Sequence, residues 1–469
     1  MEKQLSVNCS KKLLRFHQMF FNKKIETMNR KNLDVLVEDR IRYTIKYANE
    51  NSPFYRTWFR KHKVNPNEIR THADLLKLPI ISGKTILENQ PPQSKDFHFR
   101  SVGRDQIFTI NETSGTSGPP KAFFLTWNDW ERYAEKYARA FVSQGFGKGD
   151  RIIVCASYGM NVGANTMTLA ASKIGITIIP EGTCVFPLRV IINYKPTGLI
   201  GSVFKFLRLA RQMSKEKIRP SESGVKRLVI GGESFAEESR SYLEEVWGCK
   251  VFNTYGSTEG TICGECSQTN GLHVPEDLAH LDLYDPNLQD FVKDGESGRI
   301  ILSTLLPLGE KSGNILLNYD TEDTTMVISR NKCACGRNHM KIFNPQREEE
   351  NFWINKIPFN RVDVERGVFQ RENMEYLTGE YEAFLKGGRI TEEINLSVNL
   401  ECRDDKNCNI AGVEENFLKG FLKFKPQLRR EYSENRFKIN LNFLGKKELQ
   451  IYRSKGRPKR VIDKRHIDG

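Results

Sequence analysis

The sequence predicts an α/β protein with a large N-terminal domain and a smaller α+β domain behind it. Two strand–helix–strand units predict the first domain. Apolar strand-like runs at 151–156 and 177–179 enclose a small-residue helical segment at 164–174, and a second strand–helix–strand unit follows at 225–253. Strands that alternate with helices in this way are typical of a mostly parallel sheet covered by helices.

The second domain is predicted from a change of pattern near residue 345. The run NPQREEE at 344–350 is charged, contains a proline and breaks the apolar pattern, so we expect a linker there. The roughly 120 residues that follow have mixed strand and helix patterns, which suits a small α+β domain. A chain of 469 residues has room for two or three domains. We expect domains at 1–345 and 346–469.

Individual elements follow from the spacing of apolar residues. Near the N-terminus, apolar side chains recur at intervals of three and four residues, as on the buried face of a helix: Leu33, Val37, Ile41, Ile45 and Ala48. Further on, a strand at 225–230 ends at Gly231-Gly232-Glu233, and a helix at 237–246 and a strand at 250–253 follow. The polar segment 157–161 comes directly after a strand, where ligands bind in such folds, and is a candidate substrate wall.

Composition limits the class of protein. No apolar run approaches the roughly 18 residues that a membrane span needs, and the N-terminus lacks a signal-peptide core, so we expect a cytoplasmic protein without membrane contact. The 10 cysteines lack the dense spacing of a disulfide scaffold, which favours reduced thiols or a metal site. The net charge of +14 could attract an acidic substrate or a nucleic acid, but a solvated basic surface is the favoured explanation.

The segment TSGTSGPPK at 113–121 predicts a site for a polyphosphate. Its glycines let backbone N–H groups turn toward an anion, its hydroxyls can donate to phosphate oxygens, and Lys121 adds a positive charge. The segment differs from the Walker pattern because two prolines precede the lysine and no hydroxyl residue follows it. Alone, such a run is more often an ordinary loop.

Two later segments favour the polyphosphate site over an ordinary loop: YGSTEG at 255–260 and NYDTED at 318–323. The three segments, in this order, resemble those of adenylate-forming enzymes, the superfamily of acyl-CoA synthetases, luciferases and peptide-synthetase adenylation domains. Within it, the chain is most similar to the phenylacetate-CoA ligase-like branch. The resemblance extends over nearly the whole chain, from NSPFY at 51–55 to RSKG at 453–456.

The resemblance implies that ATP and Mg²⁺ are used. It assigns Lys121 and Glu259 to catalysis, Glu259 with Thr116 to Mg²⁺, Tyr255 to adenine and Asp323 to the ribose hydroxyls. The further nucleotide-binding residues that it implies are Thr113, Ser114, Gly115, Thr116, Ser117, Gly118, Gly232, Glu233, Gly256, Thr258 and Arg347. In the family, the C-terminal domain rotates on a hinge between two half-reactions, so we expect a mobile domain here.

A second constellation predicts a structural zinc site. Cys333-Ala334-Cys335, Cys266 and His273 supply three thiolates and an imidazole, a set that suits tetrahedral Zn²⁺. A C-x-C pair alone is more often two reduced thiols, but the segments around Cys266 and His273 resemble zinc-holding segments of phenylacetate-CoA ligase-like proteins. Cys263 and His339 are the alternative ligands.

The tail departs from the family. Most relatives end in R-S-x-G-K with a catalytic lysine, whereas this chain has Arg453-Ser454-Lys455-Gly456-Arg457. We therefore expect Arg457 to be the catalytic cation, with Lys455 and Lys459 as alternatives. The run KGRPKR at 455–460 also matches the core of an AT-hook, which binds the minor groove of DNA, but nucleic-acid binding is the less favoured reading.

The acceptor of the adenylyl group is predicted from three segments at 344–348, 358–365 and 375–381. They resemble the coenzyme F-390 synthetases, which adenylylate the hydroxyl of the deazaflavin coenzyme F-420. This resemblance makes an anionic or aromatic small molecule the expected partner. The alternative is activation of an aryl or acyl carboxylate, with transfer to coenzyme A or a carrier protein. A shared fold does not decide between them.

Overall fold

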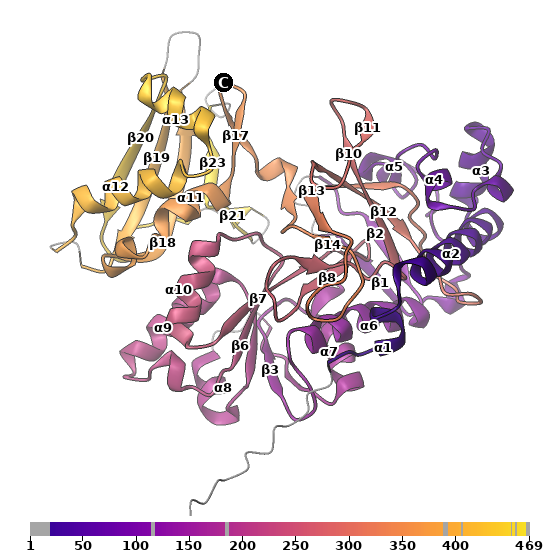
Figure 1. The fold of residues 1–469 in the computed structure, drawn as a ribbon, viewed down its shortest axis with the longest axis horizontal. Helices are drawn as coiled ribbons and strands as arrows, with labels where there is room; N and C mark the ends of the chain where they lie inside the picture. The colour runs from indigo at the N-terminus through magenta and orange to yellow at the C-terminus, as the bar shows by residue number, and fades with distance from the viewer. Residues whose placement is uncertain are drawn as a thin grey trace, which may run out of the picture.

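The computed structural model describes residues 19–113, 118–182, 187–387, 393–404, 407–451, 453–454 and 457–465. It confirms the predicted fold class, with one large sheet flanked by helices and a separate, smaller sheet formed by the C-terminal part (Figure 1). Among the described residues, no helix is both long enough and apolar enough for a membrane span.

The large sheet has 13 strands and is parallel in one half. The parallel strands lie in the order β4-β3-β5-β6-β7 and alternate with helices along the chain, as the sequence predicts. These elements are β3 (Arg151–Val154), α7 (Gly163–Ile174), β4 (Thr177–Ile179), α8 (Pro187–Tyr194), β5 (Gly198–Gly201), α9 (Val203–Lys215), β6 (Arg227–Gly231), α10 (Glu237–Trp247) and β7 (Lys250–Gly256). Helices α7 and α10 both end at a left-handed glycine, Gly175 (φ 73°) and Gly248 (φ 61°), a common helix stop.

The other half of the sheet is antiparallel. It contains β8 (Ile262–Glu265), β9 (Leu272–His273), β10 (Ala279–Asp285), β11 (Asp290–Phe291), β12 (Ser297–Thr304), β13 (Tyr319–Ser329), β14 (Lys341–Ile342) and β15 (Gln346–Arg347). The run expected to be a linker is ordered at its centre, because β15 pairs with β13 and a 3₁₀ turn follows at Glu348–Glu350. The domain boundary at 345/346 stays a prediction.

The N-terminal part of the chain contributes further helices and one hairpin. They are α1 (Lys23–Glu26), α2 (Arg30–Asn51), α3 (Pro53–Lys61), α4 (His72–Leu75), α5 (Gly83–Glu88), the hairpin of β1 (Thr109–Glu112) and β2 (Ala122–Leu125), and α6 (Trp127–Ser143). All five residues of the predicted helical stripe are buried on α2. A capping box of Thr126 and Asp129 begins α6, which packs against α7 and β8.

The C-terminal part has its own four-stranded sheet in the order β20-β19-β18-β23. Its elements are β16 (Phe352–Ile354), β17 (Ile357–Phe359), α11 (Arg361–Val368), β18 (Leu377–Lys386), β19 (Ile394–Cys402), α12 (Ile410–Phe421), α13 (Pro426–Ser433), β20 (Phe437–Leu444), β21 (Arg453–Ser454), β22 (Arg457–Pro458) and β23 (Val461–Asp463). It packs on α9 and α10, where Phe204 and Tyr242 meet Phe369 (Figure 1).

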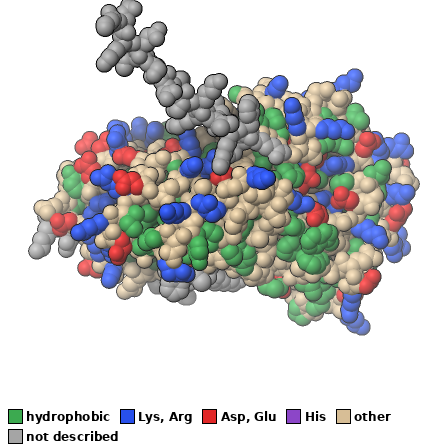
Figure 2. Space-filling model, turned by 90° about the horizontal axis from the view of Figure 1, so that it is seen from below, with side chains coloured by type: hydrophobic (Ala, Val, Ile, Leu, Met, Phe, Trp, Pro, Cys, Tyr) green, Lys and Arg blue, Asp and Glu red, His purple; other side chains and the backbone are tan. Residues whose placement is uncertain are grey.

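The surface charge is mixed on the face drawn in Figure 2, where Lys and Arg side chains are interspersed with Asp and Glu. The arginine that ends the AT-hook-like run is not available at the surface. Arg460 is only 2% exposed, lies over the ring of Phe204 and donates to the carboxylate of Glu380 at 2.6 Å. A buried arginine cannot reach a DNA groove in this arrangement.

Candidate functional site

A cavity of about 300 Å³ lies where the loops after β1, β3 and β7 meet β13. The carboxyl ends of parallel strands are the expected place for a ligand in this fold. The structure brings together at this cavity eight of the residues predicted from sequence: Thr113, Gly118, Lys121, Gly256, Thr258, Glu259, Asp323 and Arg347. Asn161, from the predicted substrate wall, lines it too.

Lys121 and Glu259 form the charged pair of the cavity. The Lys121 Nζ lies 3.1 Å from the Glu259 Oε1 and donates to the hydroxyl of Tyr319 at 2.5 Å. That hydroxyl is in turn 3.5 Å from the Glu259 carboxylate. Both charged side chains are mostly buried, at 18% and 11% exposed, so their charges are poorly screened by water.

Helix α6 fixes the backbone of the loop that carries Glu259. The Tyr133 hydroxyl donates to the Thr258 carbonyl at 3.2 Å, and the Lys136 ammonium donates to the Gly260 carbonyl at 2.7 Å. Gly260 has a φ of 102°, and a Cβ there would lie 2.8 Å from the Tyr133 hydroxyl, so only glycine fits. Burial lowers the pKa of Lys136 to about 7.

Asp323 lines another side of the cavity, whereas Tyr255, predicted to contact adenine, is not a lining residue and lies behind Asp323 as its hydrogen-bond partner. The Tyr255 hydroxyl donates to the Asp323 Oδ2 at 2.5 Å, and the Arg347 Nε is 3.8 Å from the Oδ1. The pairing of β13 with β15 places Asp323 directly opposite Arg347. Burial raises the pKa of Asp323 to about 6, against the effects of Tyr255 and Arg347. The hydrogen bond from Tyr255 fixes the orientation of the carboxylate.

Several predicted residues lie elsewhere or outside the described residues. Gly232 and Glu233 do not line the cavity, since the Glu233 carboxylate accepts from the Val203 N–H at 2.8 Å and pairs with Arg361 at 3.1 Å. Ser114, Gly115, Thr116 and Ser117 lie outside the described residues, as does the side chain of Arg457, whose backbone belongs to β22. The nucleotide, Mg²⁺ and catalytic roles of these residues stay predictions.

Among the residues that line the cavity, Lys84 and Tyr137 received no role from the sequence. Tyr319, whose hydroxyl contacts the Lys121 ammonium, received none either. Tyr319 belongs to the NYDTED segment and could have been noticed there. Lys84 and Tyr137 give no comparable signal, because one is a lysine on a short helix and the other a tyrosine in an amphipathic one. Only the fold brings them to the cavity.

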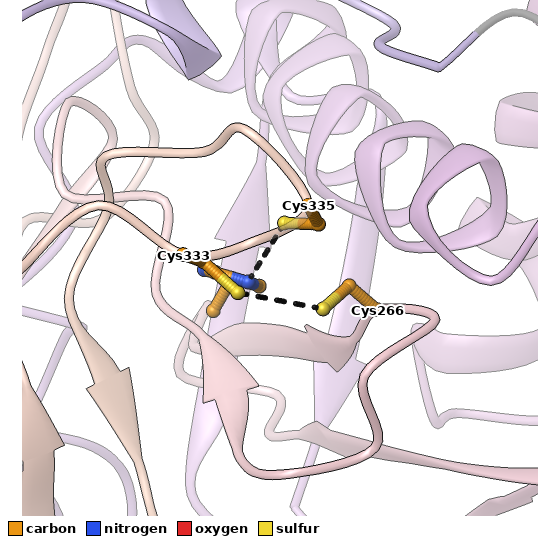
Figure 3. Close-up of side chains that lie close together, drawn as sticks. Cys266, Cys333 and Cys335 are labelled. Carbon is orange, nitrogen blue, oxygen red and sulfur yellow. Dashed lines mark hydrogen bonds between the residues drawn. The ribbon is translucent and has the colours of Figure 1, made fainter.

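The cysteine and histidine side chains predicted to bind zinc meet in one buried cluster. The ligand atoms of Cys266, His273, Cys333 and Cys335 all lie within 4.8 Å of one another. Figure 3 shows the Cys266 and Cys333 thiols facing each other, with Cys335 close by. The sulfur atoms of Cys266 and Cys333 are 3.9 Å apart. The Cys335 Sγ is 3.5 Å from the His273 Nε2. Three sulfur donors and one nitrogen donor at this spacing fit a tetrahedral metal ion.

Neighbouring groups orient the cluster. The His273 Nδ1 lies 3.4 Å from the His339 carbonyl, a contact that leaves the Nε2 free to act as a ligand. His339 itself is not in the cluster, since its Nδ1 accepts from the Glu276 N–H, and Cys263 is likewise outside it. The hydrogen bond from Cys266 lowers the pKa of Cys335, which favours a thiolate there.

Comparison with known proteins supports a ligase that uses ATP. The chain is 28% identical over 330 residues to a phenylacetate-coenzyme A ligase of Thermus thermophilus, covering 69% of this chain and 72% of that protein. It is 27% identical over 311 residues to a phenylacetate-coenzyme A ligase of Escherichia coli, covering 65% and 69%. Residues 36–305 match the AMP-binding enzyme family, and the chain belongs to that family. It is an adenylate-forming ligase.

Solved structures agree on the fold. A 2-hydroxyisobutyryl-CoA ligase in the postadenylation state matches with a TM-score of 0.80 at 20% identity, over 97% of this chain and 95% of that one. An open conformation of the same ligase matches with a TM-score of only 0.66 at 20% identity, over 97% and 96%. This chain therefore superposes better on the first of these two structures than on the second.

Proposed function

We propose that this enzyme converts a carboxylate into an acyl adenylate with Mg-ATP, releases pyrophosphate, and transfers the acyl group to coenzyme A. The observation that carries the proposal is the cavity in which Lys121, Glu259 and Asp323 meet. The relatives named above are phenylacetate-coenzyme A ligases, which supports the choice of a carboxylate and of coenzyme A.

Each side chain of the site has a role in this reaction. Attack on the α-phosphate brings anions together, so positive charge must be supplied where the pyrophosphate leaves. Lys121 supplies it once its ammonium turns from Glu259 to the phosphate oxygens. The Glu259 carboxylate is then free to hold Mg²⁺, and Asp323 accepts both ribose hydroxyls. Mg²⁺ would stabilise the charge that develops on the leaving group.

The carboxylate substrate is proposed to bind on the side of the cavity formed by Tyr137, Asn161 and Gly256. A Cβ at Gly256 would lie 3.0 Å from the Tyr137 hydroxyl, and the same hydroxyl would be 3.5 Å from a Cβ at Gly163. Glycine at both positions leaves room beside a tyrosine hydroxyl. In this narrow space next to the proposed phosphate site, the Tyr137 hydroxyl can donate a hydrogen bond to a carboxylate oxygen.

Adenylyl transfer to the hydroxyl of coenzyme F-420 is the second candidate. The segments at 344–348, 358–365 and 375–381 favour it, and so does the tail, where Arg457 replaces the usual lysine. Arginine keeps the charge but replaces a compact ammonium with a planar fork. A phenolic acceptor that is already anionic near neutral pH needs less help from that cation than a carboxylate does.

Product analysis distinguishes the two candidates. The purified chain is incubated with ATP, Mg²⁺ and coenzyme A, and with phenylacetate, other aryl acids, short acyl acids or coenzyme F-420 in separate reactions. The first candidate predicts an acyl-CoA, AMP and pyrophosphate, with an acyl adenylate when coenzyme A is left out. The second candidate predicts an adenylylated deazaflavin in place of the acyl-CoA. If neither product forms with any compound, both candidates are wrong.

We also propose that the cluster of Cys266, His273, Cys333 and Cys335 binds a structural Zn²⁺. The support is a donor set of three thiols and one imidazole with a matching geometry. Four protein ligands leave no open position, so this ion would stabilise the fold without taking part in catalysis.

A further inference from the structure

A second group of metal-binding side chains lies outside both sites described above. His72 begins helix α4, and His280 and Asp282 belong to β10. Alternate residues of a strand point to the same face, so the sequence His-Leu-Asp places His280 and Asp282 side by side. The register of β10 with β12 agrees, since His280 pairs with Ser303 and Asp282 with Ile301. Helix α4 then brings His72 to this pair.

The three side chains are close enough to share one ion. The His72 Nε2 lies 2.7 Å from the Asp282 Oδ1, and the His280 Nε2 lies 3.2 Å from the Asp282 Oδ2. The two imidazole rings have their centroids 4.4 Å apart. The three ligand atoms all lie within 4.8 Å of one another. The ligand atoms of a tetrahedral ion with bonds near 2.0–2.1 Å are about 3.3 Å apart. Small movements of the three side chains would therefore bring their ligand atoms to these distances.

An independent observation points to a ligand. The His280 Nε2 is buried and lies 3.2 Å from the Asp282 Oδ2, but the contact lacks the geometry of a hydrogen bond. His280 as a whole is only 7% exposed. A buried polar nitrogen without a well-formed hydrogen bond costs free energy, so its retention needs a reason. Coordination to a cation would give this nitrogen a partner.

We propose that His72, His280 and Asp282 form a second metal site, which binds a borderline divalent ion such as Zn²⁺ or Ni²⁺. Two imidazoles and one carboxylate suit such ions, whereas Mg²⁺ and Ca²⁺ prefer oxygen ligands. Three protein ligands leave at least one position open to water. The His72 side chain is 44% exposed, so an ion can enter from solvent and the histidine can adjust on its four-residue helix. The bound ion would tie α4 to the large sheet.

Nearby charges affect the site in opposite directions. Arg330 disfavours a cation close to His72, and Asp34 favours one.

The test is equilibrium dialysis of the full chain against Zn²⁺ at neutral pH, followed by metal analysis. We expect His72→Ala and His280→Gln each to bind about one Zn²⁺ fewer per chain than the parent. His62→Ala, at an exposed histidine outside the group, is the matched control and should bind as much as the parent. Since His72 is half-exposed, its variant should fold, which circular dichroism checks.

Cys333→Ser separates this site from the cysteine cluster. Any ion lost in that variant belongs to the cluster, and the ion assigned here should remain. Cobalt in place of zinc gives a second readout, because of these two sites the cysteine cluster alone has sulfur ligands that produce sulfur-to-metal charge-transfer bands. Equal zinc content in the parent, His72→Ala and His280→Gln would overturn the proposal and leave the three side chains as an ion-paired clamp.

Discussion

The ammonium of Lys121 is shared between a carboxylate and a phenol, at 3.1 Å from Glu259 and 2.5 Å from Tyr319. Because Glu259 is mostly buried, its charge needs a nearby cation, and Lys121 is the cation that supplies it. A nucleotide with its metal ion would supply that charge instead and release the lysine for the phosphates. The resting ion pair and the catalytic arrangement are therefore alternatives for the same two side chains.

Glu259→Gln tests this exchange. The amide keeps the shape of the side chain but removes the charge that would hold Mg²⁺. We expect the adenylation rate to fall on the order of 100-fold or more, because a charged contact of the transition state is lost. Pyrophosphate release measures it, with circular dichroism to confirm folding. Unchanged activity in a folded Glu259→Gln would remove Glu259 from the site.

Asp323 predicts a pH dependence of nucleotide binding. Its pKa is raised to about 6 by burial, so the carboxylate is ionised above that pH and can accept both ribose hydroxyls. As the pH falls through about 6, protonation removes acceptor capacity and affinity should fall. At pH 5 we expect binding to be weaker by up to about tenfold than at pH 7.

Asp323→Asn provides the control for that measurement, because ATP itself titrates in the same range. Calorimetric titration of both proteins at several pH values gives the ratio of their dissociation constants, in which the titration of ATP cancels. The account predicts a ratio that changes near pH 6. A ratio that stays constant from pH 5 to 8 would mean that Asp323 is not the ribose acceptor.

At the scale of elements, the cysteine cluster joins two loops that are distant in sequence. Cys266 follows β8, whereas Cys333 and Cys335 lie between β13 and β14, where Gly336 turns the chain with a φ of 92°. Strands β9 and β14 are only two residues long, so little backbone pairing holds these loops. A metal ion would supply the missing constraint.

Cys333→Ser tests the structural role of that ion. We expect it to lower both zinc content and Tm together, the latter by about 5–10 °C, because metal binding is coupled to folding. Cys408→Ser is the matched control, at a partly buried cysteine outside the cluster, and should change neither. Zinc-free protein with an unchanged Tm would contradict the assignment.

The strongly patterned elements were predictable from sequence, and the short ones were not. The α2 stripe follows from apolar spacing, because the helix buries one face. Strand β3 follows from a continuous apolar run, because consecutive residues of it are buried. Strands β9, β14 and β15 have two residues each, too few for any pattern. The contact of Lys121 with Tyr319 joins residues 198 positions apart, and only the fold can show it.

At the scale of the whole molecule, one carboxylate joins the two parts of the chain. Glu380 on β18 is 5% exposed and accepts from Arg208 at 2.6 Å and from Arg211 at 2.8 Å, both on α9. Arg460, which belongs to the C-terminal part, donates to the same carboxylate at 2.6 Å. If the C-terminal part rotates, Glu380 must leave the α9 arginines while it keeps Arg460.

Arg208→Gln with Arg211→Gln should therefore weaken the present arrangement. Charge-assisted hydrogen bonds of partly buried groups are worth about 1–2 kcal/mol, which corresponds to a shift on the order of tenfold between arrangements. We expect slower adenylation relative to the second half-reaction, measured separately in single-turnover experiments. Arg219→Gln, in an exposed pair with Glu222, is the control. An unchanged ratio of the two rates would show that this contact does not govern the arrangement.

The central claim is that the chain forms an adenylate, and ATP–pyrophosphate exchange tests it most directly. Labelled pyrophosphate, ATP and Mg²⁺ are supplied with carboxylic acids or coenzyme F-420, without coenzyme A. The account predicts that label enters ATP with at least one of these compounds, and that Glu259→Gln slows the exchange on the order of 100-fold or more. If folded, ATP-binding protein instead produces ADP and phosphate while all label stays in pyrophosphate, the claim is wrong.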